Sequence, residues 1–301
     1  MSPRHDRARA VATGLLILLT AVWGSTFFLI HDLVTTVAPV DFLAIRFTIA
    51  AVVMAVVLWR PMRALGRREW LAGLGLGGLY GLAQILQTIG LAHTDASVSG
   101  FVTGTYVVLT PLLSALVLRE RVPRTTWYAV LLATAGLAVL SLNGVSIGLG
   151  EALTLGCALV YALHIVGLGR LSTPSHATGM AAVQMVVIAV LCDVVAVPDG
   201  ITWPHDGGQW ASVIYMAVAA GALALWVQTW AQAHMSATRA AIVMTLEPVF
   251  AALFAVLFGG EPLTLRMLLG GLLVLAAMYL VELLGRRADR RSTEVLHHEV
   301  T

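Results

Sequence analysis

Two long stretches of this chain resemble each other, and both consist of apolar runs. A block near residues 83–140 recurs near residues 224–281 with an almost constant offset of 141 positions. The identical pairs include Gln87 with Gln228, Thr88 with Thr229, and Glu120 with Glu261. Because each copy is a series of runs long enough to form helices, the sequence predicts a duplicated helical bundle.

The composition places this bundle in a membrane. Hydrophobic residues make up 59% of the 301 residues, charged residues make up 11%, and the mean hydropathy is +0.88. Soluble domains carry about 25% charged residues, so we expect an all-α integral membrane protein. The net charge is only +2, and the arginines stand in short clusters between apolar runs, so no nucleic-acid surface is expected.

A helix needs about 20 apolar residues to cross a bilayer. Cutting the chain at its charged and turn-forming clusters predicts ten such spans. They cover residues 11–31, 39–60, 69–92, 95–118, 125–141, 149–170, 176–197, 210–231, 236–258 and 263–284.

The arginines indicate how these spans are oriented, since positively charged short loops stay on the cytoplasmic side. They gather in both tails and in the connections near 60–68 and 119–124. The loops near 32–38, 142–148 and 198–209 contain none. The pattern predicts a multi-pass protein of the plasma membrane with both termini in the cytoplasm.

Each copy holds five spans, which is an odd number. The second copy must therefore enter the membrane from the opposite side, so the repeats are inverted. The predicted organisation is a cytoplasmic tail at 1–10, a first repeat at 11–141, a second repeat at 149–284 and a cytoplasmic tail at 285–301. Transporters built from two such repeats place the substrate site at the interface between them.

Glu247, followed by Pro248, is the most unusual residue of the membrane part. It lies about eleven residues from the cytoplasmic end of its span, which is about 16 Å deep at 1.5 Å per residue. A carboxylate there is costly unless protonated, paired or hydrated, so Glu247 is the candidate for coupling or for the central charge. Pro248 interrupts the backbone hydrogen bonds near the path. A buried carboxyl bonded to neighbouring hydroxyls is the alternative.

Arg46 is the second costly charge, at a similar depth in the second span. An ion pair with Glu247 is one interpretation, and snorkelling toward the outer headgroups is the other. In the alignment of the repeats Arg46 corresponds to Gln184, so the charge is not symmetrical.

Polar and aromatic side chains of several spans are predicted to line a substrate path. Thr26 aligns with His164 of the second repeat, and Tyr106 aligns with Glu247. The predicted lining comprises Trp23, Thr26, Arg46, Gln84, Gln87, Tyr106, His164, Gln184 and Gln228. Ordinary packing and hydrogen bonds between helices are the alternative roles of these residues.

Other patterns are interpreted as structure. Gly73, Gly77 and Gly81 recur every fourth residue and predict a close helix contact. Cys157 and Cys192 lie inside apolar runs, which predicts small core residues and neither a disulfide nor a metal site. A glycine-rich fingerprint and a Gly-x-Ser-x-Gly motif lack the strand and helix context that their enzymes need. No cofactor is expected.

Several longer motifs carry a resemblance to a known family. They are Trp23-Gly24-Ser25-Thr26, Phe42-Leu43-Ala44-Ile45-Arg46-Phe47, Gln87-Thr88-Ile89-Gly90-Leu91, residues 105–111, and Leu246-Glu247-Pro248 with the stretch to Glu261. With them the chain resembles an EamA-type member of the drug/metabolite transporter superfamily over about residues 11–284. The resemblance implies ten helices in two inverted repeats, a central cavity and alternating access. Members export amino acids, metabolites or toxic compounds, so the cargo stays open.

The combined expectation is a secondary transporter, not an enzyme, that exports a small polar or amphipathic metabolite or drug. A proton or another coupling ion is the expected energy source for uphill transport, because the sequence has no phosphate-binding loop for ATP. The expected partners are a small-molecule substrate and the lipid bilayer. A non-transporting scaffold and a membrane-embedded enzyme using His164 with Glu247 are the alternatives, and the oligomeric state is open.

Overall fold

The computed structural model describes residues 3–93, 96–117, 119, 122–141, 148–196, 200–258, 263–266, 268–277 and 279–280, and all regular secondary structure in them is helical. In chain order the elements are α1 (Pro3–Gly24), α2 (Thr26–Leu33), α3 (Pro39–Val57), α4 (Trp59–Arg63), α5 (Arg67–Leu91), α6 (Ala96–Gly104), α7 (Tyr106–Val117), α8 (Arg124–Ser141), α9 (Leu149–Leu171), α10 (Ala177–Ala196), α11 (Gly207–Ala217), the π-helix η2 (Val218–Leu223), α12 (Ala224–Gln232), α13 (Ala237–Met244) and α14 (Glu247–Leu257). A last helix follows at Leu268–Ala277.

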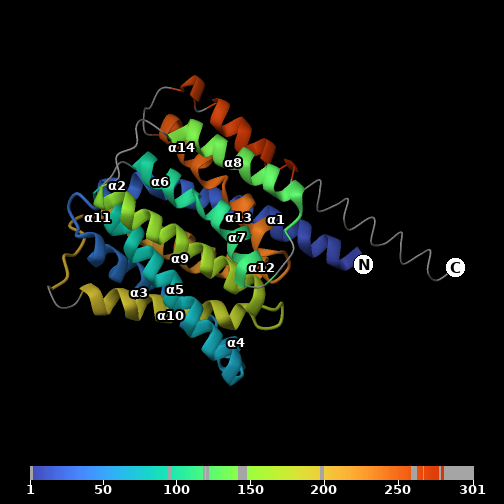
Figure 1. Ribbon diagram of the computed structural model, residues 1–301. Helices are drawn as coiled ribbons and strands as arrows, with labels where there is room; N and C mark the ends of the chain where they lie inside the picture. Colours follow the sequence, from blue (N-terminus) through green and yellow to red (C-terminus); the bar gives the residue numbers. More distant parts are fainter. Residues whose placement is uncertain are drawn as a thin grey trace.

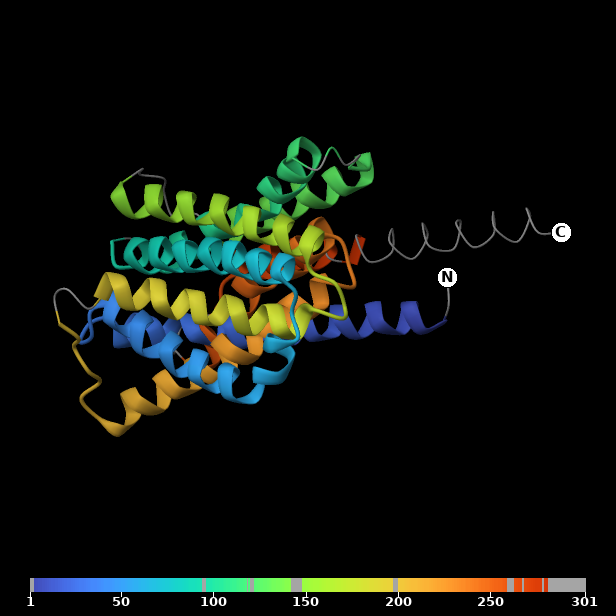
Figure 2. The same ribbon diagram turned by 90° about the horizontal axis from the view of Figure 1, so that it is seen from below.

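The helices lie side by side as one bundle (Figure 1). α1 begins at the N-terminal end of this bundle, and the connection between α10 and α11 lies at the opposite, distal end (Figure 2). Within the described residues, seven helical segments are long and apolar enough to cross a membrane. They are Arg7–Gly24, Pro39–Val57, Arg67–Leu91, Leu149–Leu171, Ala177–Ala196, Gly207–Gln232 and Ala237–Phe254. Three shorter apolar helices accompany them, at Val102–Val117, Thr126–Gly136 and Leu268–Ala277.

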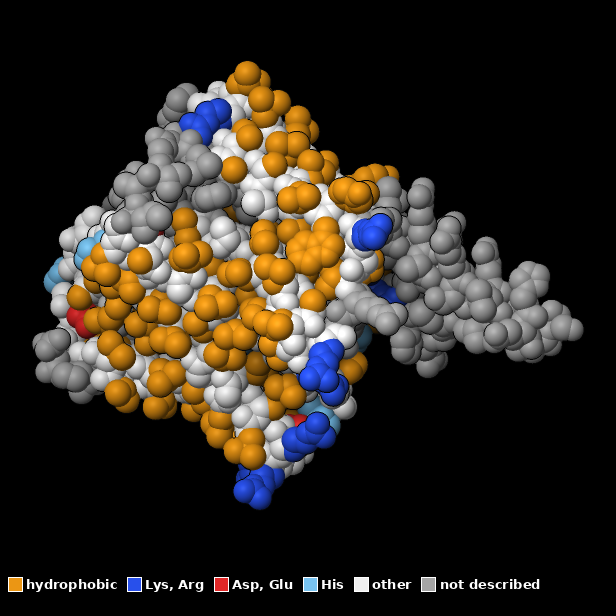
Figure 3. Space-filling view, in the orientation of Figure 1, with side chains coloured by type: hydrophobic (Ala, Val, Ile, Leu, Met, Phe, Trp, Pro, Cys, Tyr) orange, Lys and Arg blue, Asp and Glu red, His pale blue; other side chains and the backbone are white. Residues whose placement is uncertain are grey.

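Apolar side chains cover much of the surface of the bundle. On the face shown in Figure 3 they spread across the middle, while most arginines gather toward the N-terminal end. Leu18 is 62% exposed, Val56 is 69% exposed and Leu116 is 78% exposed. A soluble monomer does not expose an apolar surface of this extent, whereas lipid tails solvate it. The chain is a multi-pass membrane protein.

Four predicted spans match single helices within two residues, namely 69–92 (α5), 125–141 (α8), 149–170 (α9) and 176–197 (α10). The second predicted span ends early. Residues 39–60 were expected as one helix, whereas α3 stops at Val57 and α4 projects from the bundle as a separate helix (Figure 1). Pro61 lacks the N–H that would bond to the carbonyl of Val57, so α3 cannot continue through it. In α4, the guanidinium groups of Arg60 and Arg63 lie 5.9 and 5.4 Å from the centroid of the Trp59 ring.

The structure describes the N-terminal end of the chain more fully than the C-terminal end. α1 begins at Pro3, so most of the tail expected at 1–10 is helical. The tenth expected span, 263–284, is represented by the helix at Leu268–Ala277. Its end and the tail at 285–301 lie outside the described residues.

The glycine stripe of α5 brings α10 into close contact with it. A Cβ atom added at Gly73, Gly77 or Gly81 would come within 2.9, 2.8 or 3.0 Å of an atom of α10. The predicted close helix contact is therefore confirmed. Cys157 and Cys192 are buried and unbonded to each other, as expected for small core residues.

Candidate functional site

Three of the predicted spans are interrupted near their middle. The first span breaks at Ser25 between α1 and α2, and the fourth breaks at Thr105 between α6 and α7. The ninth breaks at residues 245–246 between α13 and α14. The last two breaks are related by the same offset of 141 that relates the two sequence blocks.

Local side-chain chemistry explains the two related breaks. The hydroxyl of Thr105 donates to the carbonyl of Val102 at 2.6 Å, and the hydroxyl of Thr245 donates to that of Ile242 at 2.6 Å. Such bonds compete with the helical pattern of the backbone. In the second repeat Pro248 also lacks the N–H that would continue the helix.

The break before α14 rests against the break after α1. A Cβ atom added at Gly24 would lie 2.7 Å from Cβ of Phe250, 2.8 Å from N of Ala251 and 3.0 Å from the carbonyl oxygen of Glu247. No side chain fits between these two backbones, so glycine sets the distance between α1 and α14. The first turn of α14, which carries Glu247, therefore lies directly beside the α1–α2 break.

This contact predicts a strong effect of a small substitution. We expect Gly24→Ala to lower the free energy of unfolding by about 1–3 kcal/mol, because the new methyl group meets backbone atoms that cannot turn away. Gly14→Ala in the same helix is the matched control, since a Cβ there has nothing within 4 Å. Thermal unfolding of the purified protein in detergent measures both. Equal melting temperatures for the two variants would show that the α1–α14 contact can accommodate a methyl group at position 24.

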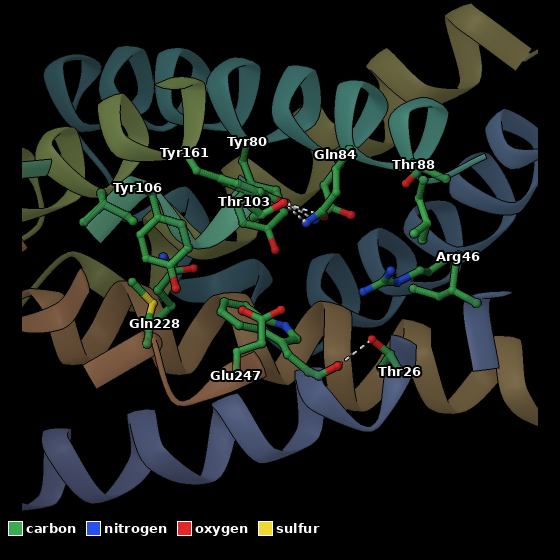
Figure 4. Close-up of a pocket in the computed structure, with 16 residues that line it drawn as sticks. Thr26, Arg46, Tyr80, Gln84, Thr88, Thr103, Tyr106, Tyr161, Gln228 and Glu247 are labelled. Atoms are coloured by element: carbon green, nitrogen blue, oxygen red, sulfur yellow. Dashed lines mark hydrogen bonds between the residues drawn. The ribbon is translucent and has the colours of Figure 1, made fainter. Parts of the chain in front are cut away.

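A cavity of about 740 Å³, open solvent included, lies beside the helix breaks (Figure 4). It is lined by Trp23, Thr26, Ile30, Arg46, Tyr80, Gln84, Gln87, Thr88, Leu91, Thr103, Tyr106, Tyr161, Ile165, Gln228, Met244 and Glu247. The lining combines aromatic rings, amides, hydroxyls, a carboxyl and a guanidinium, which suits a small molecule with both polar and apolar parts.

Glu247 is the first residue of α14 and lies well inside the bundle. It follows Ala237, the first residue of α13, by ten positions, which corresponds to about 15 Å along a helix. The helix dipole favours a negative charge at this N-terminus. Among the described residues its carboxyl has no hydrogen-bond or ion-pair partner, and Figure 4 shows it pointing into the cavity. The alternative of a carboxyl bonded to neighbouring hydroxyls is thus not what the structure shows.

Arg46 bonds to the backbone and not to Glu247. Only 4% of it is exposed, and its Nε and one Nη donate to the carbonyl oxygens of Met216 and Ala220, each at 3.2 Å. The indole Nε1 of Trp23 donates to the same Ala220 oxygen at 3.0 Å. Ala220 belongs to η2, where the wider π-helical turn displaces carbonyls from the α-helical pattern. The guanidinium therefore neither pairs with Glu247 nor snorkels to the surface.

A chain of hydrogen bonds joins α5, α9 and α6 along one wall of the cavity. Nε2 of Gln84 donates to the hydroxyl of Tyr161, which donates to Oε1 of Gln87 at 3.2 Å. Nε2 of Gln87 donates to the hydroxyl of Thr103 at 3.3 Å. The Tyr161 ring also packs edge-on against Tyr80, with centroids 5.5 Å apart. This wall holds its polar groups in fixed positions before any ligand arrives.

Seven of the residues predicted for the path border this cavity, together with Glu247. The seven are Trp23, Thr26, Arg46, Gln84, Gln87, Tyr106 and Gln228. Pro248 stands behind Glu247 and is not part of the lining. His164 and Gln184 also do not border the cavity, so the expectation that they line it does not hold for this structure.

His164 and Gln184 instead form a buried polar network behind the cavity wall. Nε2 of His164 lies 2.9 Å from Oε1 of Gln184, and Nε2 of Gln184 donates to the hydroxyl of Thr229 at 3.4 Å. The edge-on ring of Tyr80 separates His164 from the cavity, with centroids 5.1 Å apart. Because the glycine stripe lets α10 pack directly on α5, Gln184 is enclosed and does not face the cavity.

This placement predicts that Gln184 matters for stability and not for cargo. Gln184→Leu removes a partner from His164 and from Thr229, so we expect a loss of about 1–3 kcal/mol in the free energy of unfolding. The KM for transport should stay unchanged. Gln84→Leu, which alters the cavity wall itself, should raise KM. Thermal unfolding measures the effect on stability, and initial transport rates measure the effect on KM. A changed KM with an unchanged melting temperature in Gln184→Leu would place Gln184 on the substrate path.

The cavity includes polar and aromatic residues that the sequence did not single out as path residues. They are Tyr80, Thr88, Thr103 and Tyr161. Tyr80 precedes Gln84 by one helical turn and Gln87 by two, so a comparison of faces along this span would have found it. Thr103 and Tyr161 carry no such signal, because their position depends on how α6 and α9 pack against α5.

Comparison with known proteins decides the family. A family model described as the EamA-like transporter family matches residues 12–142 and 148–283, which is nearly the whole chain in two copies. The chain belongs to the EamA-like transporter family. This EamA-like protein is a membrane transporter and not an enzyme.

Relatives of this EamA-like transporter cover most of its length. An uncharacterized transporter of Archaeoglobus fulgidus is 32% identical over 89% of this chain and 84% of its own length. The uncharacterized transporter YvbV of Bacillus subtilis is 27% identical over 89% of this chain and 90% of its own length. A solved crystal structure with 20% sequence identity matches 93% of this chain and 99% of its own, with a TM-score of 0.74, which is a likeness of fold.

Proposed function

We propose that this EamA-like transporter exports a small polar or amphipathic metabolite or drug across the plasma membrane by alternating access. The observation that carries the proposal is the cavity at the helix breaks. It holds a carboxyl without a protein partner among the described residues, a buried guanidinium and a prearranged wall of amides and hydroxyls. A non-transporting scaffold does not require an ionisable carboxyl group at this depth, where such a group is costly.

In this proposal the seven long helical segments and the three shorter apolar helices together form ten spans. The repeats at 11–141 and 149–284 then hold five spans each and lie inverted in the membrane. The matching breaks at Thr105 and at residues 245–246 support this arrangement. The gathering of arginines toward the N-terminal end supports a cytoplasmic position of that end and of both termini (Figure 3).

We further propose that this conformation faces outward. The lining reaches Leu91, the last residue of α5, at the distal end of the bundle. Toward the N-terminal end, Ile165 of the lining belongs to a buried apolar cluster that also includes Leu16, Val166 and Met235. An exporter in this state has released its cargo outside, and the cluster must part before the next cargo enters from the cytoplasm.

Glu247 is proposed to bind the proton or other coupling cation. Its carboxyl has no competing protein donor within the described part of the chain, so a cation can reach it. A bare carboxylate is expensive to enclose in a low-dielectric bundle, whereas a neutralised one is not. Binding of a cation would thus permit the cavity to close around Glu247.

The proposed export is tested by untargeted mass spectrometry of the medium. Cells that overproduce the transporter are compared with cells that carry an empty vector, at matched density. We expect one compound, or a few related ones, to be enriched outside and depleted inside the overproducing cells. Identical profiles would contradict export, and enrichment inside the cells would show uptake.

A further inference from the structure

Gln232 lies outside the cavity lining and accepts a hydrogen bond from Gln228, which belongs to it. We propose that Gln232 orients the amide of Gln228 so that its oxygen is the free acceptor at this end of the cavity. Together with the Glu247 carboxyl it would bind a cargo group with several N–H donors, such as a protonated amine or an amidine. The inference rests on the proposed function only in treating the cavity as the cargo site.

The orientation follows from a hydrogen-bonded chain that starts at the backbone of α9. Nε2 of Gln232 donates to the carbonyl oxygen of Ile165 at 2.8 Å, and Nε2 of Gln228 donates to Oε1 of Gln232 at 3.2 Å. A carbonyl can only accept, so Gln232 must turn its NH₂ group to Ile165 and its oxygen to Gln228. Gln228 must then turn its own NH₂ group to Gln232. The backbone carbonyl thus fixes the orientation of both amides.

The oxygen of Gln228 is left without a donor. Gln228 borders the cavity and is only 3% exposed, and its Oε1 has no hydrogen-bond partner within the described residues. Buried acceptors that are shielded from water and unpaired are unfavourable, and they are rare in folded proteins. A hydrogen-bond donor supplied by the cargo would remove this cost and so favour binding of that cargo.

The surroundings favour a positively charged donor group. Figure 4 shows Gln228 and Glu247 toward one end of the cavity and Arg46 toward the other. The amide oxygen and the carboxylate are both acceptors, so a group with two or more N–H donors satisfies both at once. A quaternary ammonium ion has the charge but no donor. The pair should therefore distinguish primary amines from quaternary ones.

The first repeat lacks this orienting device. Leu91 stands at the position that corresponds to Gln232, and Leu91 has no amide. Gln87, the counterpart of Gln228, accepts from Tyr161 and donates to Thr103, so both ends of its amide are engaged. The free acceptor is thus specific to the second repeat, which also supplies Glu247.

Protection of Glu247 from a hydrophobic carbodiimide tests the inference without any knowledge of the cargo. The purified full-length protein is labelled in lipid nanodiscs, and mass spectrometry measures the adduct on Glu247. Butylammonium and tetramethylammonium are the probes, since they carry the same charge at similar size. We expect butylammonium to protect at a concentration about tenfold lower than tetramethylammonium, as one charge-assisted hydrogen bond would give. Equal protection by the two ions, or none by either, would overturn the proposal.

Variants test the role of Gln232. Gln232→Leu introduces the residue of the first repeat and frees the Gln228 amide to turn, so the difference between the two ions should disappear. Gln228→Met removes the acceptor itself and should have the same effect if Gln232→Leu does not fold. Thr178→Val, which removes the 3.1 Å bond from Trp226 of α12, is the matched control and should keep the wild-type difference. Full discrimination in a folded Gln232→Leu protein would overturn the positioning role.

The labelling assay requires no transport, so the proposed export and the proposed amine site can be contradicted independently of each other. Selective protection of Glu247 in a protein that exports nothing would contradict the proposed function alone. Export without any preference for butylammonium would contradict the Gln228–Glu247 amine site alone.

Discussion

Glu247→Gln is expected to reduce the initial rate of cargo export by about 10- to 100-fold. The amide keeps the shape of the carboxyl but cannot carry its charge or release a proton. Hydrogen bonds to charged groups contribute about 1.5–3 kcal/mol, and about 1.4 kcal/mol corresponds to a factor of ten. The measurement is transport of the cargo identified in the medium, into proteoliposomes with equal amounts of each protein.

The same experiment separates coupling from simple binding. Wild-type transport should change with pH if Glu247 handles the coupling proton, and Glu247→Gln should lose that dependence. Glu69→Gln is the matched control, because Glu69 lies in the first turn of α5 and does not border the cavity. An unchanged pH dependence in Glu247→Gln would assign coupling to another group.

Arg46→Met is expected to destabilise the protein more than either Gly24→Ala or Gln184→Leu. It removes two buried hydrogen bonds, from the guanidinium to the carbonyl oxygens of Met216 and Ala220, and the Ala220 oxygen keeps the bond from the Trp23 indole. Each buried polar group that is left without a partner costs about 1–3 kcal/mol. The π-helix η2 should then lose its present form. Thermal unfolding and the yield of folded protein in the membrane measure the effect.

Arg46→Lys should fall between wild type and Arg46→Met. A single ammonium group does not reproduce the planar fork that reaches two carbonyls, nor the contact of the guanidinium with Phe47, 4.9 Å from the ring centroid. Arg63→Met is the control, since Arg63 is exposed on α4 and its guanidinium lies over the Trp59 ring. If Arg46→Met melts at the wild-type temperature, the guanidinium is not what holds η2.

Much of the architecture follows from the sequence because a bilayer imposes simple rules. Length and hydropathy place α5, α9 and α10 within a few residues of their observed ends. The depth of Glu247 also follows from counting along its span. The glycine stripe predicts a close helix contact, although it does not say that α10 is the partner.

Tertiary contacts decide what the sequence leaves open. His164 aligns with Thr26, yet α10 encloses it behind Tyr80 and Thr26 borders the cavity. The charge of Arg46 suggested a carboxylate partner, whereas the π-helical turn supplies carbonyl oxygens at that depth. No local pattern signals a π-helix in residues 218–223, so this partner was not predictable.

The most direct test of the path is the accessibility of a cysteine in the cavity from each side of the membrane. Thr26→Cys is placed in a chain whose two native cysteines, Cys157 and Cys192, are replaced by alanine, and impermeant maleimides are applied to sealed vesicles of either orientation. Leu18→Cys on the exposed apolar face of the same α1–α2 segment is the control and should stay unlabelled. We predict labelling at position 26 from either face, in a ratio that cargo shifts. A cysteine that neither reagent reaches, or that cargo does not affect, would contradict transport through this cavity.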